Sequence, residues 1–116
     1  MEYEKDIRVR TKKFAVRIIK LVLELKVQGV EYSLRDQILR SGTSLGANVR
    51  EGKASSSKKE LIRYYEIALR SANETDFWME TIEEGYDLDS SLMKNDKSEL
   101  LEISKVLGTI IINLKK

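Results

Sequence analysis

The chain has 116 residues, enough for one domain, with no cysteine, no histidine and no proline, and its formal net charge is +2. The absence of cysteine and histidine excludes thiolate and imidazole metal sites, cysteine nucleophiles, serine–histidine triads and disulfides. No apolar run approaches the roughly 18 residues of a membrane span, and the charged start MEYEKDIRVRTKK is unlike a secretory signal. We therefore expect residues 1–116 to form a single soluble, cytoplasmic domain without a metal or a cofactor.

The charge is unevenly distributed along the chain. Residues 1–70 hold 16 Lys and Arg against 9 Asp and Glu, whereas residues 71–116 hold 5 against 10. Such asymmetry can mark a surface for nucleic acid or for an acidic partner, and it can equally pair one helix of the protein with another. We favour the second interpretation, and the sequence leaves both open.

Residues 6–27 are predicted to form an amphipathic helix. Projection at 100° per residue gathers one apolar face and an opposite basic face; the apolar face is Ile7, Phe14, Ile18, Leu21, Val22 and Leu25, and the basic face is Arg10, Lys13, Arg17 and Lys20. A second apolar strip beside the first consists of Val16, Ile19, Leu23 and Val27. A helix of a small monomer has too few neighbours to bury both strips, so we expect self-association through the second one.

A break at Gly29 separates this helix from a second one, predicted over residues 34–54. Ser33 is a suitable N-cap residue, and Asp36 supplies negative charge in the first turn. The predicted inner face is Leu34, Ile38, Ser41, Leu45, Asn48, Val49 and Gly52. Gly42 and Gly46 remove side-chain bulk from one edge of this helix, which indicates the close approach of another backbone.

The third and fourth helices complete the prediction. The run Ser57-Lys58-Lys59-Glu60 matches a capping box, and the helix that it starts keeps its period to about Gly85. Its inner residues are Leu61, Tyr65, Ala68, Leu69, Ala72, Met79 and Tyr86. The fourth helix is predicted from about Asp89 to Leu114, with residues 89–96 left open, and its inner residues are Leu100, Ile103, Leu107, Ile110, Ile111 and Leu114. Four helices joined by short polar turns predict an all-α, antiparallel up-down-up-down four-helix bundle.

The glycine-rich stretch from Ser41 to Glu60, SGTSLGANVREGKASSSKKE, is not a phosphate loop of the Walker type. Five residues rather than four separate Gly46 from Gly52, Ala54 stands where a hydroxyl is needed, and no strand is predicted before it. The serine run therefore serves as a connector and a helix cap.

Asn48 and Glu51 lie at or near the inner stripe of the second helix, where an unpaired polar group costs roughly 1–3 kcal/mol. The candidate partners are Ser71, Asn73 and Glu74, with Arg70 or Arg40 as counter-charges. Glu51 paired with Glu74 would suit acid–base chemistry or a metal, but di-metal bundles use Glu-x-x-His pairs and this chain has no histidine. We favour a structural polar network that fixes the register of the helices.

The stretch QILRSGTSLGANVREGKASSSKKELIRYYEIALRSANETD resembles the core of the 23S rRNA intervening-sequence proteins, a family of four-helix bundles. The matching positions are Gln37, Arg40, Ser44, Ala47, Asn48, Glu51 and Gly52, then Lys59, Glu60, Ile67, Ala68, Ser71, Glu74 and Asp76. The chain departs from the family pattern at Gly46, Arg50 and Arg70, where the family has proline, alanine and glycine.

The resemblance implies a homo-oligomeric ring, a pentamer, and no known enzyme activity. It also implies a structural motif composed of Ser44, Asn48, Glu51, Gly52, Ser71 and Glu74. Members of the family are encoded within rRNA insertions, and distant relatives are accessory proteins of diversity-generating reverse transcriptases. The resemblance thus implies RNA or another nucleic acid as a partner, and no small-molecule substrate.

Two functional hypotheses follow, and no nucleophile–base pair or ligand cluster favours an enzyme. The first is an oligomeric RNA-binding accessory module whose basic residues are multiplied by the ring: Arg10, Lys13, Arg17 and Lys20 on the first helix, and Arg50, Lys53, Lys58, Lys59 and Arg63 around the second connection. The aromatic residues Tyr64, Tyr65, Phe77 and Trp78 are predicted to pack rather than to stack on bases. The alternative is a protein–protein interaction scaffold without a nucleic-acid role, which uses the same rim or the acidic tail.

Overall fold

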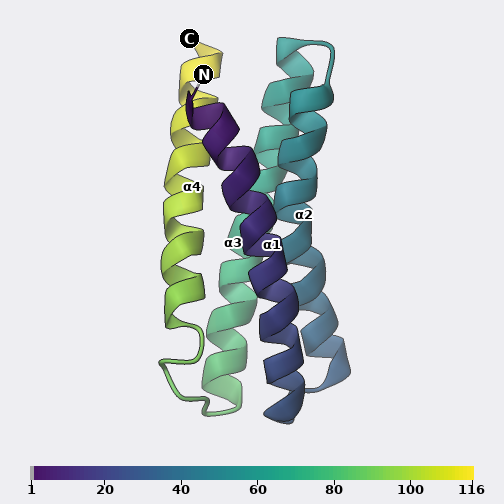
Figure 1. Cartoon of the computed structure of the whole chain (residues 1–116), viewed down its shortest axis with the longest axis vertical. Helices are drawn as coiled ribbons and strands as arrows, with labels where there is room; N and C mark the ends of the chain where they lie inside the picture. The colour runs from purple at the N-terminus through teal and green to yellow at the C-terminus, as the bar shows by residue number, and fades with distance from the viewer. Residues whose placement is uncertain (1) are drawn as a thin grey trace.

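Four α-helices make up the fold in the computed structural model, which describes residues 2–116, with side chains from Ile7 onward. They are α1 (Glu2–Val27), α2 (Tyr32–Ala54), α3 (Lys58–Gly85) and α4 (Lys94–Lys115). Successive helices run in opposite directions in a bundle 44 × 21 × 19 Å in size (Figure 1). Within the described residues α1 and α3 each pack against α2 and α4 but not against one another, so they occupy one diagonal. The all-α fold predicted from the sequence is confirmed.

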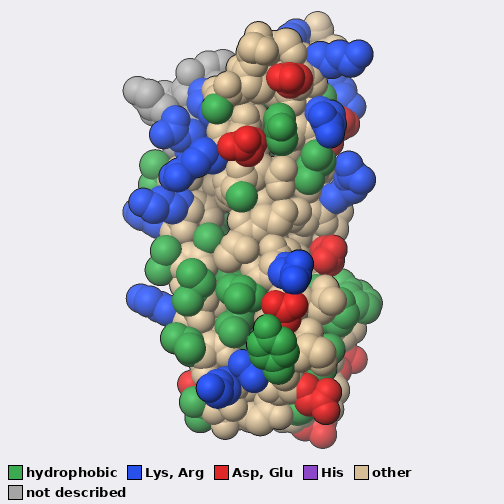
Figure 2. All heavy atoms as spheres, turned by 90° about the vertical axis from the view of Figure 1, so that its right-hand side faces the viewer, with side chains coloured by type: hydrophobic (Ala, Val, Ile, Leu, Met, Phe, Trp, Pro, Cys, Tyr) green, Lys and Arg blue, Asp and Glu red, His purple; other side chains and the backbone are tan. Residues whose placement is uncertain are grey.

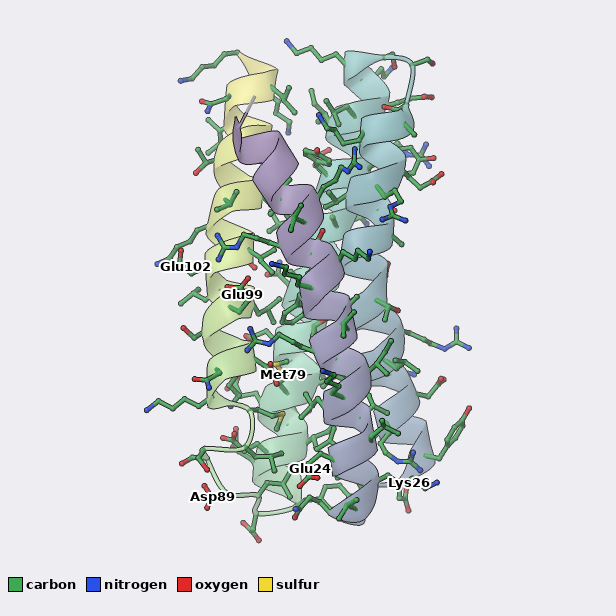
Figure 3. All side chains as sticks on the ribbon, in the orientation of Figure 1. Glu24, Lys26, Met79, Asp89, Glu99 and Glu102 are labelled. Atoms are coloured by element: carbon green, nitrogen blue, oxygen red, sulfur yellow. The ribbon has the colours of Figure 1, made fainter. Side chains whose placement is uncertain are left out.

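The core lies along the axis of the bundle and is built from the predicted inner faces. Fully buried large side chains come from every helix: Ile7, Phe14, Ile18, Leu25, Ile38, Leu45, Tyr65, Met79, Ile82, Leu100 and Ile103. Figure 3 shows Met79 in the interior between the ribbons. Other predicted inner residues lie half-buried at the edges of the core: Val22, Leu34, Leu61, Leu69, Tyr86 and Leu114. Because each fully buried large apolar side chain contributes about 1.5–3 kcal/mol, this core is the main source of stability.

The start of α2 differs from the prediction. The helix begins at Tyr32, and Glu31 rather than Ser33 occupies the N-cap position, without a side-chain capping bond. The turn before it contains Gly29 in the left-handed region, with a φ of 84°, and it is held by one tertiary hydrogen bond, which the Glu31 N–H donates to the Tyr86 hydroxyl at 3.1 Å. Asp36 lies beyond the first turn. The prediction of Ser33 as the N-cap was therefore wrong. A hydrogen bond between this connection and Tyr86 positions the start of α2, and no local sequence pattern reveals such a bond.

The start of α3 agrees with the prediction, and the start of α4 decides the segment 89–96 that the sequence left open. Ser57 Oγ accepts the Glu60 N–H at 3.1 Å, so the predicted N-cap of α3 is confirmed. α4 begins only at Lys94, because Asp89 organises a turn instead of a helix: its Oδ1 accepts the Ser91 N–H at 2.9 Å and the Ser91 hydroxyl at 2.7 Å. These bonds lower the pKa of Asp89, and the backbone N–H of Ser91 is the larger cause. The labelled Asp89 lies in the connection at the lower end of Figure 3.

The close backbone approach predicted at the glycines of α2 is confirmed at Gly46, where a Cβ would lie 2.9 Å from the Thr11 carbonyl oxygen of α1. At Gly42 the neighbour is a side chain of α1 instead, because a Cβ there would lie 2.7 Å from Ile18 Cγ1. Thr11 is itself fully buried, and its hydroxyl donates to the Ile7 carbonyl oxygen at 2.7 Å. Only glycine allows the two helices to pack backbone against backbone at this crossing.

Candidate functional site

A polar network joins α2 to α3 inside the bundle. Asn48 Nδ2 donates to the carbonyl oxygen and to Oγ of Ser44, both at 2.9 Å, and Ser71 Oγ donates to Ser44 Oγ at 3.1 Å. One helical turn away, Thr75 Oγ1 lies 2.9 Å from Ser41 Oγ and 2.7 Å from the Ser71 carbonyl oxygen. Two inter-helix contacts at successive turns fix the register of α2 against α3. The sequence pointed to Asn48 and Ser71 but missed Thr75, whose position one turn beyond Ser71 was the available signal.

The two glutamates of the predicted motif lie outside this network. Glu51 and Glu74 are exposed, so the cost of burying a charge, which was the reason to expect partners for them, does not arise. The proposed counter-charge Arg40 instead donates to Asp36 at 2.9 Å. Within the part of the chain that the structure describes, no three carboxylates come together to hold a metal ion.

Gly52, another member of the predicted structural motif, is buried, and a Cβ there would lie 2.9 Å from Tyr65 Cε1.

Two of the predicted nucleic-acid residues pair with α4. Arg10 makes a bidentate contact with Glu99, with Nη2–Oε1 at 2.7 Å and Nε–Oε2 at 3.1 Å. Arg17 Nε donates to Asp96 Oδ1 at 2.8 Å. In Figure 3 Glu99 lies on the side of α4 next to α1, and Glu102 points away from the bundle. Both arginines therefore lie on the side of α1 that faces α4, and not opposite its core face. These two ion pairs also account for part of the charge difference between residues 1–70 and residues 71–116.

Of the other predicted cations, Lys53 is half-buried and the rest are exposed. Lys13 and Lys20 of α1 are exposed. The remaining residues gather around the α2–α3 connection, where Figure 2 shows blue side chains at the upper end of the bundle: Arg50, Lys53, Lys58, Lys59 and Arg63. Lys53 and Lys58 line a shallow polar pocket of about 230 Å³ together with the three serines of the connection. We call this group the basic end.

Only some of the aromatic side chains that were predicted to pack are buried. Tyr65 is buried as predicted, but Phe77 is 55 % exposed and makes an edge-to-face contact with Trp78 at 5.1 Å between ring centroids. The prediction that Phe77 packs therefore holds only for its contact with Trp78, because more than half of the side chain is exposed. It lies 18 residues after Lys59 on α3, about 27 Å along the helix, so it cannot stack on a base held at the basic end.

The second apolar strip of α1 is exposed, in agreement with the prediction that its own chain cannot bury it. Its members are Val16, Ile19, Leu23 and Val27, with exposed fractions of 45, 48, 62 and 78 %, and Val9 extends it at 52 %. In Figure 2 apolar and basic side chains follow one another down the left-hand edge, which α1 forms. No helix of the described chain is long and apolar enough to cross a membrane. The strip, from Val9 to Val27, is named the α1 strip below.

The comparisons with known proteins agree on one family. Residues 4–109 match the family described as 23S rRNA-intervening sequence protein. The fold is similar to the crystal structure of a protein with unknown function from the S23 ribosomal protein family of Bacteroides thetaiotaomicron VPI-5482, with 35 % identity and a TM-score of 0.89; 94 % of this chain and 97 % of that chain are covered. Among curated proteins none matches the sequence. The chain therefore belongs to the 23S rRNA-intervening sequence protein family.

Proposed function

We propose that this chain is a non-enzymatic protein that self-associates through the α1 strip and binds structured RNA through the basic end. The family name links its members to rRNA sequences, which supports RNA as the partner. Arg10 and Arg17 are left out of the proposed surface because they are paired with Glu99 and Asp96. The proposed RNA-binding surface is the basic end together with Lys13 and Lys20, which are exposed cations of α1.

The observation that carries the proposal is the position of Lys58 and Lys59. They occupy the first turn of α3, where the helix dipole and the free N–H groups already make the potential positive. A cation there costs the fold about 0.3–1 kcal/mol, so the two lysines do not serve stability. Lys53, in contrast, lies in the last turn of α2, where a cation is favourable for the helix. An anionic partner is therefore the role that we propose for positive charge at a place unfavourable to the helix.

Self-association increases the affinity of such a surface for RNA. A phosphate contact made by one exposed lysine is weak, but several copies of the basic end on one particle bind one RNA with a raised effective concentration. A closed ring of copies, a pentamer in the form that the family resemblance implies, is part of the proposal. The α1 strip supports it because five large apolar side chains exposed along one helix are a surface that a further copy of the chain would cover.

The test is a fluorescence-anisotropy titration of a structured RNA hairpin across a salt series. The double variant Lys58→Gln/Lys59→Gln should bind more weakly and show a less steep dependence of log K on log salt, by up to about 0.9 for each lost phosphate contact. The matched control Lys94→Gln/Lys105→Gln removes the same charge from exposed positions of α4 and should bind like the wild type. Absence of binding even at low salt, or an equal loss in both variants, would contradict the proposal.

One observation favours the second candidate function, a protein-binding scaffold. Exposed Phe77, in contact with Trp78, lies between the exposed carboxylates of Asp76 and Glu80, an apolar residue with an acidic border. A basic peptide with an apolar anchor would suit this surface. If the RNA series shows no binding while a lysine-rich amphipathic peptide binds the wild type and not Phe77→Ser, the scaffold function replaces the RNA-binding one.

A further inference from the structure

A groove lies between α3 and α4 on the outside of the bundle. Its volume is about 410 Å³, and its lining residues are Glu66, Leu69, Arg70, Asn73 and Ile111. Ile111 is buried and Leu69 is half-buried against the core, so these two side chains give the groove an apolar floor. Arg70 and Asn73 are exposed and form a polar rim. An apolar floor bordered by a few polar groups, in a volume of this size, is typical of a site for a small organic group.

The two polar side chains of the rim are available to a ligand. Among the side chains that the structure describes, neither Arg70 nor Asn73 forms a hydrogen bond or an ion pair. Arg10 and Arg17, in contrast, are each bound to a carboxylate of α4. Arg70 and Asn73 are three residues apart on α3, so their side chains are neighbours on one face of the helix. Together they offer the donors of a planar guanidinium and both the donors and the acceptor of an amide.

The charges around the groove favour an anionic strand outside it and a neutral group within it. One lining residue, Glu66, carries a carboxylate, and it accepts a hydrogen bond from Lys115 Nζ at 2.8 Å. Arg63 of the basic end lies one turn before Glu66, and about 10 Å along α3 from Arg70. Figure 1 places the C-terminal end of α4, which carries Lys115, at the same end of the bundle as the α2–α3 connection. The groove is therefore continuous with the basic end.

We propose that this groove receives an unpaired nucleobase of the RNA whose phosphates are held at the basic end. This inference deepens the proposed function and rests on it. Leu69 and Ile111 contact one face of the base, the guanidinium plane of Arg70 stacks on it from the rim, and the amide of Asn73 bonds its edge. Unpaired bases of RNA are recognised by such stacking and edge contacts, which bases inside a duplex cannot make.

A base suits this groove better than the other groups that a basic surface attracts. A phosphate would use Arg70, but it would gain nothing from the apolar floor and would be repelled by the Glu66 carboxylate. An apolar protein side chain would cover the donors of Arg70 and Asn73 without replacing their hydrogen bonds to water, which is costly. A nucleobase is neutral, has an apolar face and carries donors and acceptors at its edge, so it matches both the floor and the rim.

The experiment compares two RNA hairpins by fluorescence anisotropy with the full-length protein. Both have the same stem and a single-stranded extension with the same number of phosphates, but in one of them the extension is abasic. The wild type should bind the hairpin with bases about fivefold more tightly, as expected for one base stacked on a guanidinium. Because the two RNAs carry equal charge, this ratio measures contacts with the base and not with the phosphates.

Two variants remove the rim, and two controls are matched to them. Arg70→Gln and Asn73→Leu should reduce the ratio to about one, and Asn73→Leu should keep the wild-type affinity for the abasic hairpin because it removes no charge. Arg40→Gln removes an exposed arginine of α2, which within the described chain does not pack against α4. Asn113→Leu changes an exposed asparagine of α4 outside the groove. Both controls should keep the wild-type ratio, and circular dichroism establishes that all four variants fold.

Photo-cross-linking of the wild-type protein locates the base without any substitution. A hairpin with thiouracil in its extension should cross-link to the segment 66–73 of α3 or to Ile111 of α4. Cross-links confined to α1 and α2 would overturn the groove as the binding site. Free adenosine monophosphate should compete only weakly with the hairpin, since it lacks the further phosphates that the basic end holds. Complete competition at the same concentration of base would overturn an RNA strand as the occupant.

The remaining outcomes separate the groove from the basic end. If the wild type binds both hairpins equally and in a salt-dependent manner, the groove is overturned and the proposed function stands. If Arg70→Gln and Asn73→Leu keep the wild-type ratio, the base is bound elsewhere and the groove is overturned as well. If the wild type binds neither hairpin even at low salt, the proposed function and this inference are overturned together.

Discussion

We expect Gly46→Ala to destabilise the bundle, although alanine is the better helix former. The new Cβ would lie 2.9 Å from the carbonyl oxygen of Thr11, closer than the roughly 3.3 Å of the tightest ordinary carbon–oxygen contacts. The obstacle is backbone, so no side-chain rotation relieves it and α1 has to move away from α2. A protein with alanine at position 46 should therefore fold with looser packing between α1 and α2.

The size of the effect follows from two opposing contributions. Replacing glycine by alanine inside a helix favours folding by about 1 kcal/mol, whereas overpacking of this kind disfavours it by about 1–3 kcal/mol. Because the obstacle is backbone, we take the upper half of that range and expect a net loss of about 1–2 kcal/mol for Gly46→Ala. Gly108→Ala is the matched control, since no atom within 4 Å opposes its Cβ, and it should gain about 0.5–1 kcal/mol.

Urea unfolding followed by far-ultraviolet circular dichroism measures both values, and the protein concentration must be equal throughout because assembly contributes to stability. The two variants should differ by roughly 2 kcal/mol, or about 8 °C in Tm. A Gly46→Ala protein as stable as Gly108→Ala would refute the reasoning, because it would mean that α1 and α2 are not in backbone contact at this position.

Three further predictions concern the polar contacts. Thr75→Val should lower the free energy of unfolding by about 1–2 kcal/mol, because it leaves buried hydrogen-bonding groups of α2 and α3 without a partner. A double-mutant cycle of Arg10→Ala and Glu99→Ala should give a coupling of about 0.5–1 kcal/mol, and Arg10→Ala should bind RNA like the wild type. An NMR titration should place the pKa of Asp89 below 3.8, and Ser91→Ala should raise it only part of the way, because the backbone bond persists. Since the folded-state pKa is the lower one, this contribution to stability is present above the unfolded pKa and is lost as the pH falls through the folded value.

Each of these predictions has its own control or contradicting result. Thr81→Val removes a similar intrahelical hydroxyl contact at an exposed position and should change stability little, so equal losses at both threonines would contradict a role of the inter-helix network. A marked loss of RNA affinity in Arg10→Ala would show that the ion pair opens to bind phosphate. An Asp89 carboxylate that titrates at 3.8 or above would mean that the turn before α4 is not formed in solution.

The helices and their inner faces could be predicted because they depend on periodicity, which is a local property of the sequence. The start of α3 was equally accessible, since Ser57 and Glu60 are three residues apart. The starts of α2 and α4 were not, because each depends on a contact that the helical period does not encode. For α2 it is the Tyr86 hydroxyl on the Glu31 N–H, and for α4 it is the turn that Asp89 organises.

The surfaces were predictable to different degrees. The α1 strip followed from an excess of apolar residues, and its exposure agrees with that reasoning. Arg10 and Arg17 were misplaced because a helical projection shows an angle but not the neighbour, and their carboxylate partners lie 89 and 79 residues further along the chain.

The most direct test of the central claim is the mass of the wild-type protein in solution, measured by light scattering over a wide range of concentrations. If the α1 strip is covered by further copies of the chain, the mass should be a multiple of 13.4 kDa that is stable on moderate dilution. A single species of 13.4 kDa at every concentration would contradict the account, because the strip would then be exposed to water in the native protein.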